Sequence, residues 1–410
     1  MVFVTGYRKI VMKTLRSNLL LLYAARALRG FGDGFAIIVL PAYMAAIGFD
    51  AAQIGLVAAA ALFGTAVFTL AVGFLAPRYD LKNLLIAGAA LMTLTGLAFP
   101  QFEAIGFLIA VAFFGTINPS TGDMGVLIPL EHAMLTAGVG DHERTRTFAR
   151  YSLIGALSMA VGALTAAAPD FLVGAGVPRL TAFRAMFYAY ALLGVASAAV
   201  YSCLPHAHVE ARPPAAPLKE SRSVVYKLAA LFSLDAFAGG FCVQSLMAVW
   251  LFERFNMSLS AASLFFFWAS LLAAFSYPMA AWIAKHIGLV NTMVFTHIPS
   301  SICLILAAFS PNLTVVLGLL LVRAALSQMD VPTRSSYVMA VVTPPERPAA
   351  ASVTAVPRSL ASSLSPALSG ALLTTSFLGL PLILCGSLKI VYDVALLFSF
   401  RHIKPPEESV

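Results

Sequence analysis

Apolar residues along the chain form long blocks, and short segments rich in charged residues, glycine or proline separate one block from the next. Such blocks match the roughly 20 apolar residues that an α-helix needs to cross the hydrocarbon core of a bilayer. The ten-residue alternation of a membrane β-barrel is missing. We therefore predict an all-α membrane protein with twelve transmembrane helices, at residues 18–45, 51–76, 83–102, 105–136, 147–169, 181–204, 224–253, 258–284, 289–310, 312–342, 349–375 and 379–401.

The composition excludes a soluble globular domain. Hydrophobic residues make up 60% of the 410 residues and charged residues only 11%, whereas a soluble domain has about 25% charged residues. The formal net charge of +8 comes from lysines and arginines spread over short loops, which favours an orienting role in the membrane over nucleic-acid binding. The four cysteines form no Cys-x-x-Cys pair, so we expect neither a metal site nor a disulfide framework.

The polar segment 205–223 divides the chain into two parts of similar length. It is rich in proline, alanine and charged residues, as is typical of a linker. The two parts look like repeats of each other, because Asp123 matches Asp330 and Gly34 matches Gly240 at nearly the same spacing. We predict an N-terminal six-helix half at 1–204, the linker at 205–223, a C-terminal six-helix half at 224–402 and a tail at 403–410.

The distribution of basic residues predicts the orientation of the chain. Lysine and arginine concentrate at the N-terminus, in alternate loops and in the linker, and such residues favour the cytoplasmic side. We therefore expect both termini and the linker to be cytoplasmic, in a multi-pass protein of a bacterial inner (plasma) membrane. The basic start resembles a signal peptide, but its apolar run continues past Arg26 and Arg29 to Met44, so we interpret it as the first span.

Twelve spans in two halves, with cytoplasmic termini and a central cytoplasmic linker, resemble the major facilitator superfamily over almost the whole chain. A motif of that family between spans 2 and 3 has counterparts here in Gly73, Leu75, Ala76, Arg78 and Lys82.

The resemblance also shows a departure at the cytoplasmic gate. In the family, an acidic residue of this motif helps to hold the halves together on that side, and Pro77 takes its position here. We expect Arg78, Asp80 and Arg150 to form the gate instead. The Gly-Pro motif that many drug:proton antiporters of the family carry in span 5 has no counterpart in span 5 of this chain.

Four aspartates fall on the spans that, by the resemblance, line a central cavity: Asp33 in span 1, Asp123 in span 4, Asp235 in span 7 and Asp330 in span 10. A carboxylate inside the membrane is costly unless it faces protein or water, and it marks a functional site by default. We predict that these acids bind substrate or protons. Asn118 joins them, because the glycines and prolines around it loosen span 4 and free polar backbone groups.

Helical spacing indicates which acids have a partner on their own helix. Arg29 and Asp33, and likewise Asp330 and Arg334, are four residues apart and can pair. Asp235 has no cation at that spacing, so its partner must come from another helix or be a proton. Asp123 has none either, which makes it our preferred proton carrier.

Other charged residues in the spans have alternative interpretations. Glu131 either pairs with Arg150 or stays hydrated, in a transport or a structural role. His297 is interpreted as a packing residue. Lys389 and Asp393 are interpreted as a structural pair in span 12. Arg323 could meet an anionic substrate or close the outer gate.

These features predict a secondary active transporter that works by alternating access around a site near the midplane. We expect proton-coupled export of a small neutral or cationic organic molecule. A proton symporter that imports a small organic anion, bound by Arg29 and Arg323, is the alternative, and a membrane sensor is a third interpretation.

An enzyme is not expected, because the chain has no phosphate-binding loop and no readable nucleophile–base pair. We expect no cofactor and no nucleic-acid partner. The expected partners are the small-molecule substrate, protons or another coupling ion, and the lipid bilayer, and the protein is expected to be a monomer.

Overall fold

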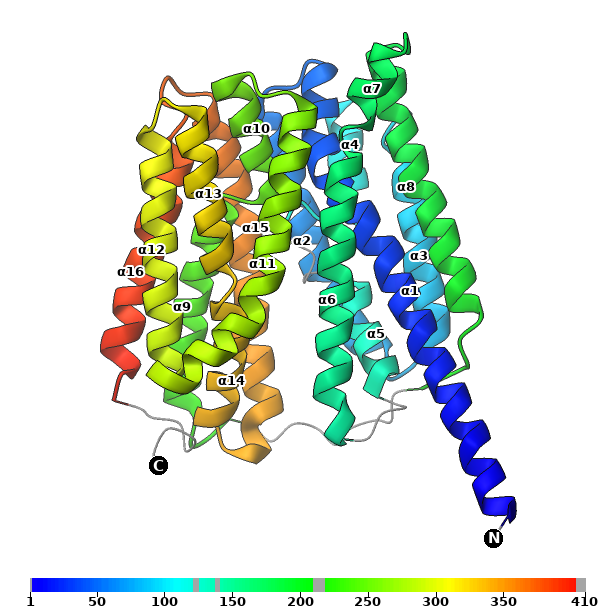
Figure 1. The fold of residues 1–410 in the computed structure, drawn as a ribbon. Helices are drawn as coiled ribbons and strands as arrows, with labels where there is room; N and C mark the ends of the chain where they lie inside the picture. Colours follow the sequence, from blue (N-terminus) through cyan, green and yellow to red (C-terminus); the bar gives the residue numbers. More distant parts are fainter. Residues whose placement is uncertain (1, 121–124, 137–140, 209–217, 403–410) are drawn as a thin grey trace.

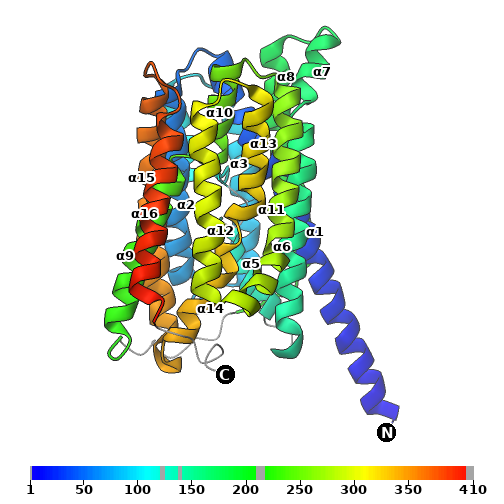
Figure 2. The same ribbon diagram turned by 60° about the vertical axis from the view of Figure 1, so that its left-hand side comes forward.

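The computed structural model describes residues 2–120, 125–136, 141–208 and 218–402, without the side chains of residues 2–17, 136 and 141–145. Long helices lie side by side in one bundle, and the start of α1 and the end of α16 lie at the same end of it (Figures 1 and 2). We call this end the terminal end and the opposite one the far end. The helices are α1 (Val2–Ala46), α2 (Ala51–Leu75), α3 (Leu81–Ala98), α4 (Ile105–Phe114), α5 (Leu127–Thr136), α6 (Asp141–Thr165), α7 (Ala168–Gly174), α8 (Arg179–Ser202), α9 (Arg222–Gly240), α10 (Gln244–Phe255), α11 (Leu259–Ile287), α12 (Leu289–Phe309), α13 (Leu313–Ser327), α14 (Asp330–Val341), α15 (Arg347–Leu373) and α16 (Leu380–Phe400), with a 3-10 turn η1 (Pro344–Glu346).

The predicted all-α membrane architecture is confirmed. In the described part of the chain, ten helical segments are long and apolar enough to cross a membrane. The predicted span 4 differs, because α4 has only 10 residues. The predicted span 11 forms the unbroken α15, which carries Arg347, Arg358 and several serines and is not among these ten segments.

Three predicted spans are each divided into two helices. Span 4 becomes α4 and α5, as its glycines and prolines predicted for residues 115–120, whereas the breaks in spans 7 and 10 were not predicted. Span 7 breaks after the glycine pair that ends at Gly240, and span 10 breaks at 328–329. Broken helices near the middle of the membrane are a common way to build a transport site.

The backbone groups freed at two of the breaks find partners on other helices. The amide of Ser245 at the start of α10 donates to the carbonyl of Pro119, 3.2 Å away, so the break in span 7 meets the break in span 4. The hydroxyl of Ser369 in α15 donates to the carbonyl of Phe241 at 2.7 Å. Irregular backbone is tolerated at membrane depth only with such partners or beside a water-filled cavity, so these contacts make the breaks possible.

The buried apolar residues form one core at the far end and two at the terminal end. The largest cluster joins both predicted halves, from Phe35 in α1 to Cys385 in α16. A second cluster, around Tyr151, lies within the first half, and a third, around Phe232, lies within the second. The halves therefore share a core only at the far end and have separate cores at the terminal end.

Contacts between the halves at the far end are close. The predicted halves meet where α2 packs against α15, α6 against α11 and α1 against α10. Gly55 faces Gly370 so closely that a Cβ built on Gly55 would lie 2.8 Å from the Cα of Gly370. Nearby, the amide and the hydroxyl of Ser260 donate to the carboxylate of Asp170, at 2.9 and 2.7 Å.

Two carboxylates at the terminal end hold the described ends of the linker, each to its own half. Asp80 caps α3 through the amide of Asn83 and accepts from the amide of Ala207 at 3.0 Å, and the ring of His206 lies 3.2 Å away. Burial alone would raise the pKa of Asp80, but these donors hold it below its ordinary value. Arg78 is exposed and Asp80 is engaged within its own half, so the gate of Arg78, Asp80 and Arg150 stays a prediction.

Glu346 plays the corresponding part in the second half. It accepts the amides of Lys219, Glu220 and Ser221 at 2.8, 3.1 and 3.0 Å. The hydrogen bond from Lys219, with those from the next two residues, lowers the pKa of Glu346 despite its burial. At both described ends of the linker, backbone amides thus donate hydrogen bonds to an ionised carboxylate.

The glycine contact at the far end predicts different effects of two matched substitutions in α2. A Cβ at Gly55 would meet the carbonyl oxygen of Pro366 at 2.5 Å, whereas a Cβ at Gly73 meets nothing within 4 Å. We expect Gly55→Ala to lower the thermal midpoint of the detergent-solubilised protein, because overpacking costs about 1–3 kcal/mol. Gly73→Ala should leave it unchanged or raise it slightly, since alanine favours a helix. Equal midpoints would contradict tight packing of α2 on α15.

The anchoring by Glu346 predicts a pH dependence. Because its pKa in the folded protein lies below the ordinary 4.5, the stability that it adds is fully present above that value and is lost as the pH falls through the folded pKa. We expect Glu346→Gln to lower the thermal midpoint at pH 7 and to flatten its decline between about pH 5 and 3. Glu220→Gln, beside it in the linker, is the control and should keep the wild-type profile. A Glu346→Gln profile parallel to that of the wild type would refute the anchoring.

Candidate functional site

A pocket of about 290 Å³ lies against the shared core, mostly among helices of the second half. Cys242, Met247 and Leu304 give it an apolar wall, and Leu62 and Ser120 close it from the first half. Small-ligand sites typically start at about this size. The charged and strongly polar side chains that line it are Asp235, Gln244, His297, Arg323, Gln328, Asp330, Arg334, Arg358 and Lys389.

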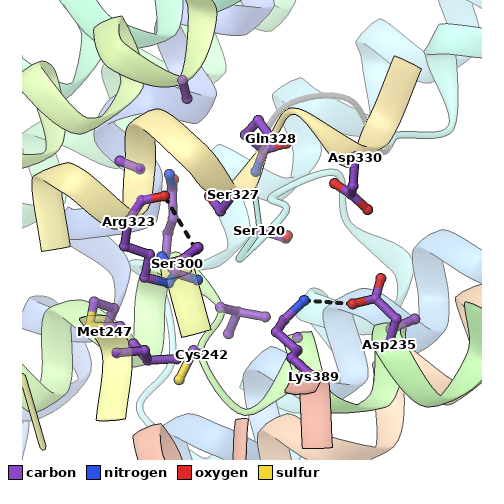
Figure 3. A pocket seen from close by; sticks show the side chains of 18 of the residues that line it. Ser120, Asp235, Cys242, Met247, Ser300, Arg323, Ser327, Gln328, Asp330 and Lys389 are labelled. Carbon is purple, nitrogen blue, oxygen red and sulfur yellow. Dashed lines mark hydrogen bonds and ion pairs between the residues drawn. The ribbon is translucent and has the colours of Figure 1, made fainter. Parts of the chain in front are cut away.

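Two predicted acids lie in this pocket within one ion-pair network. Asp235 in α9 accepts from Lys389 of α16 at 2.7 Å and from Arg334 of α14 at 3.2 Å, and Figure 3 shows the Lys389–Asp235 pair. Arg334 also donates to Asp330 at 2.9 Å, so the predicted pair on α14 is confirmed. The partner of Asp235 does come from other helices. Asp235, Asp330 and Arg334 are all buried.

His297 extends the network to Asp393. Its Nδ1 lies 3.0 Å from both oxygens of Asp393, and its Nε2 lies 3.1 Å from Nζ of Lys389. The interpretation of Lys389 and Asp393 as a pair is therefore wrong: Lys389 turns to Asp235, and Asp393 turns to His297. His297 is buried and both of its ring nitrogens have partners, as expected of a satisfied packing histidine, but these partners are charged and the ring also lines the pocket.

Two further arginines reach the same pocket without an acidic partner among the described residues. Arg323 in α13 uses its backbone carbonyl to accept from Ser300 at 3.5 Å (Figure 3), and none of the ion pairs found in the described residues involves its guanidinium. Arg358 in α15 has a buried Nε for which the described residues offer no hydrogen-bond acceptor. Arg358 was missed in the sequence, although it follows Pro357 in an otherwise uncharged stretch.

The first half holds its own buried charge pair, and neither residue of that pair lines this pocket. Glu131 in α5 is fully buried and accepts from Arg29 in α1 and from Tyr151. It also accepts from Tyr201 in α8 at 2.6 Å. Every oxygen of Glu131 is thereby satisfied by groups of the first half, which favours the structural alternative for this residue. The predicted pair of Glu131 with Arg150 is wrong, since Arg150 is exposed.

Asp33 lies next to this cluster and lines a cavity of about 30 Å³, room for roughly one water molecule. It accepts from the hydroxyl of Tyr190 at 3.4 Å, and Arg29 gives its ion pair to Glu131 instead of Asp33. Asn118 lines the same cavity and accepts from the amide of Ser120 at 2.9 Å.

The predicted proton carrier Asp123 lies outside the described residues. In the part of the chain that the structure does describe, no group of three or more His, Cys, Asp or Glu side chains could hold a metal ion.

The sequence of the chain matches a recognised family. The sequence model of the Major Facilitator Superfamily matches residues 22–252 and again residues 228–410. The chain therefore belongs to the Major Facilitator Superfamily, a class of membrane transporters to which the resemblance in the sequence had pointed.

Proteins of known and unknown role are similar to this chain. The uncharacterized membrane protein YJR124C of Saccharomyces cerevisiae is 26% identical over 96% of both chains. The nucleoside transporter NupG has a crystal structure with a TM-score of 0.72 at 14% identity, over 94% of this chain and 99% of that one. The crystal structure of the human organic anion transporter MFSD10 has a TM-score of 0.66 at 14% identity, over 93% of this chain and 99% of that one. The chain is thus a multi-pass membrane protein of transporter fold, and its location in a bacterial membrane stays a prediction.

The buried pair in the first half makes Glu131→Gln a test of its structural role. Removing one partner leaves the charge of Arg29 buried and uncompensated, which costs about 3–5 kcal/mol. We expect Glu131→Gln to have a clearly lower thermal midpoint in detergent than the unchanged protein. The matched control is Glu103→Gln, because Glu103 pairs with Arg184 at 3.2 Å on the surface and exposed pairs contribute less than about 1 kcal/mol. A Glu131→Gln loss no larger than that of Glu103→Gln would argue against the structural role.

Proposed function

We propose that this protein is a secondary active transporter that carries a small organic anion together with protons by alternating access. The observation that carries the proposal is the pair Arg323 and Arg358, two guanidinium groups on the pocket with no acidic partner among the described residues. Guanidinium groups bind carboxylates and phosphates through paired, charge-assisted hydrogen bonds.

The balance of charge supports an anion over a cation. The described pocket lining has four fixed cations, Arg323, Arg334, Arg358 and Lys389, against two acids, Asp235 and Asp330. Both acids already have cationic partners. A cationic substrate would find no free carboxylate among these residues, whereas an anion would relieve the excess positive charge. This favours the anion alternative over export of a neutral or cationic molecule.

The arrangement of apolar cores supports alternating access. The halves share a core at the far end and have separate cores at the terminal end, and the pocket lies at the boundary. If the termini are cytoplasmic, as the basic residues predict, the far end faces the outside, and the conformation described here is closed to the outside. Closing the terminal end while separating Gly55 from Gly370 would then expose the same pocket to the other side.

Fold likeness alone does not select the substrate. A nucleoside transporter and an organic anion transporter both share this fold at 14% identity. The choice of an organic anion therefore rests on the charges in the pocket.

The proposal predicts which ligands bind and which residues matter. We expect exchange of radiolabelled benzoate, succinate or uridine monophosphate across proteoliposomes, and none of uridine, xylose or choline. Arg323→Gln and Arg358→Gln should each weaken anion binding about tenfold or more, because a hydrogen bond to a charged group contributes about 1.5–3 kcal/mol. Arg401→Gln, an exposed arginine after α16, is the control and should bind as the wild type does.

Other outcomes would redirect the assignment. Exchange of choline without any anion would restore the cation interpretation. Anion exchange unchanged in both arginine variants would leave the transporter class but remove the proposed binding residues.

A further inference from the structure

The imidazole of His297 is held from both sides, and the two contacts determine where its proton lies. A lysine ammonium can only donate hydrogen bonds, so Nε2 of His297 must accept from Lys389 at 3.1 Å. That nitrogen therefore carries no proton. The ring proton is on Nδ1, which donates to Asp393 at 3.0 Å. In this arrangement His297 is neutral.

The ammonium of Lys389 and an incoming proton therefore compete for one lone pair. While Lys389 donates to Nε2, that nitrogen cannot be protonated. If Lys389 moves away, Nε2 becomes free, and the imidazolium that would form lies against Asp393 on one side and 3.9 Å from Asp235 on the other. Both carboxylates favour the positive charge.

Charge counting shows what a proton would replace. The linked groups are three carboxylates, Asp235, Asp330 and Asp393, and two fixed cations, Arg334 and Lys389. Losing Lys389 from this cluster removes one positive charge from a buried site, which is unfavourable. A proton on His297 restores that charge at the same position.

The side chain of Lys389 is able to move away from Nε2 of His297. It lines the pocket together with Arg323 and Arg358, its side chain is long and flexible, and its ammonium already faces the pocket beside Asp235 (Figure 3). An anion bound in the pocket would attract it away from His297.

We propose that His297 binds and releases the coupling proton, and that Lys389 links this proton to the bound anion. The inference rests on the proposed function for its substrate. Anion binding draws Lys389 off Nε2, a proton takes its place, and anion and proton are carried together. Release of the anion returns Lys389 to Nε2 and expels the proton.

Other charged groups around the ring set its surroundings without taking this role. The ring of Tyr392 lies edge-on at 6.1 Å, and α11, which also packs on α12, has Lys285 and His286 in its last turn. Other titratable or charged side chains on the helices around the pocket include Cys242, Cys303, Arg323, Asp330, Arg334, Arg358 and Cys385.

A ligand-free measurement tests the competition directly. In protein labelled with 15N-histidine, the signal lost in His297→Gln identifies His297 among the seven histidines. We expect a neutral ring with its proton on Nδ1 in the unchanged chain. In Lys389→Met we expect that ring to become an imidazolium between about pH 5 and 8. A proton on Nε2 in the unchanged chain, or the same titration with and without Lys389, would overturn the inference.

Transport provides a second test that separates this inference from the proposed function. In proteoliposomes, benzoate, succinate and uridine monophosphate are each followed in exchange and in accumulation driven by a pH gradient. We expect His297→Gln to lower the ratio of accumulation to exchange by about tenfold or more, and His286→Gln, an exposed histidine, to leave the ratio unchanged. A wild-type ratio in His297→Gln would overturn the role of His297. Absence of anion exchange in the wild type would instead refute the proposed function, and the histidine titration would still decide the competition.

Discussion

A buried charge without a counter-charge is what this structure must avoid, because the hydrocarbon core of a membrane offers no water to solvate it. The two halves meet this constraint differently. In the first, Glu131 is enclosed by Arg29 and two tyrosines, and neither Glu131 nor Arg29 lines the 290 Å³ pocket. In the second, Asp235 shares its cations with His297 and Asp330 at the edge of a cavity. Since the second network lines the pocket, a ligand bound there would lie against it, whereas the first is enclosed among helices of its own half.

The same constraint governs the backbone. Breaking a membrane helix frees amides and carbonyls that need new partners. Here the break at residues 115–120 supplies the carbonyl of Pro119 to the amide of Ser245, at the break in the other half. Ser369 satisfies the carbonyl of Phe241. The two halves are therefore linked through the backbone of the segments that border the pocket.

Much of this could be predicted from the sequence, since span length, charge and helical spacing are local properties. Hydropathy predicted the spans, and the four-residue spacing predicted the pair of Asp330 with Arg334. The same rule failed for Lys389 and Asp393, because it shows only that two side chains share a face and not that better partners lie across on α9 and α12. Arg358 and the breaks in spans 7 and 10 were missed for a related reason: their meaning depends on what packs against them.

The position of the pocket at the boundary between one shared core and two separate cores ties binding to conformational change. Apolar burial favours closing whichever end of the bundle can form a common core, and at the far end the glycine contact between α2 and α15 permits close approach. Arg323 and Arg358, for which the described residues offer no acidic partner, oppose further closure around the pocket, because drawing the halves together would desolvate them. An anion would remove this opposition by neutralising them. A substrate of that charge would therefore lower the barrier to moving between states, which is what a carrier, as opposed to a receptor, requires of its ligand.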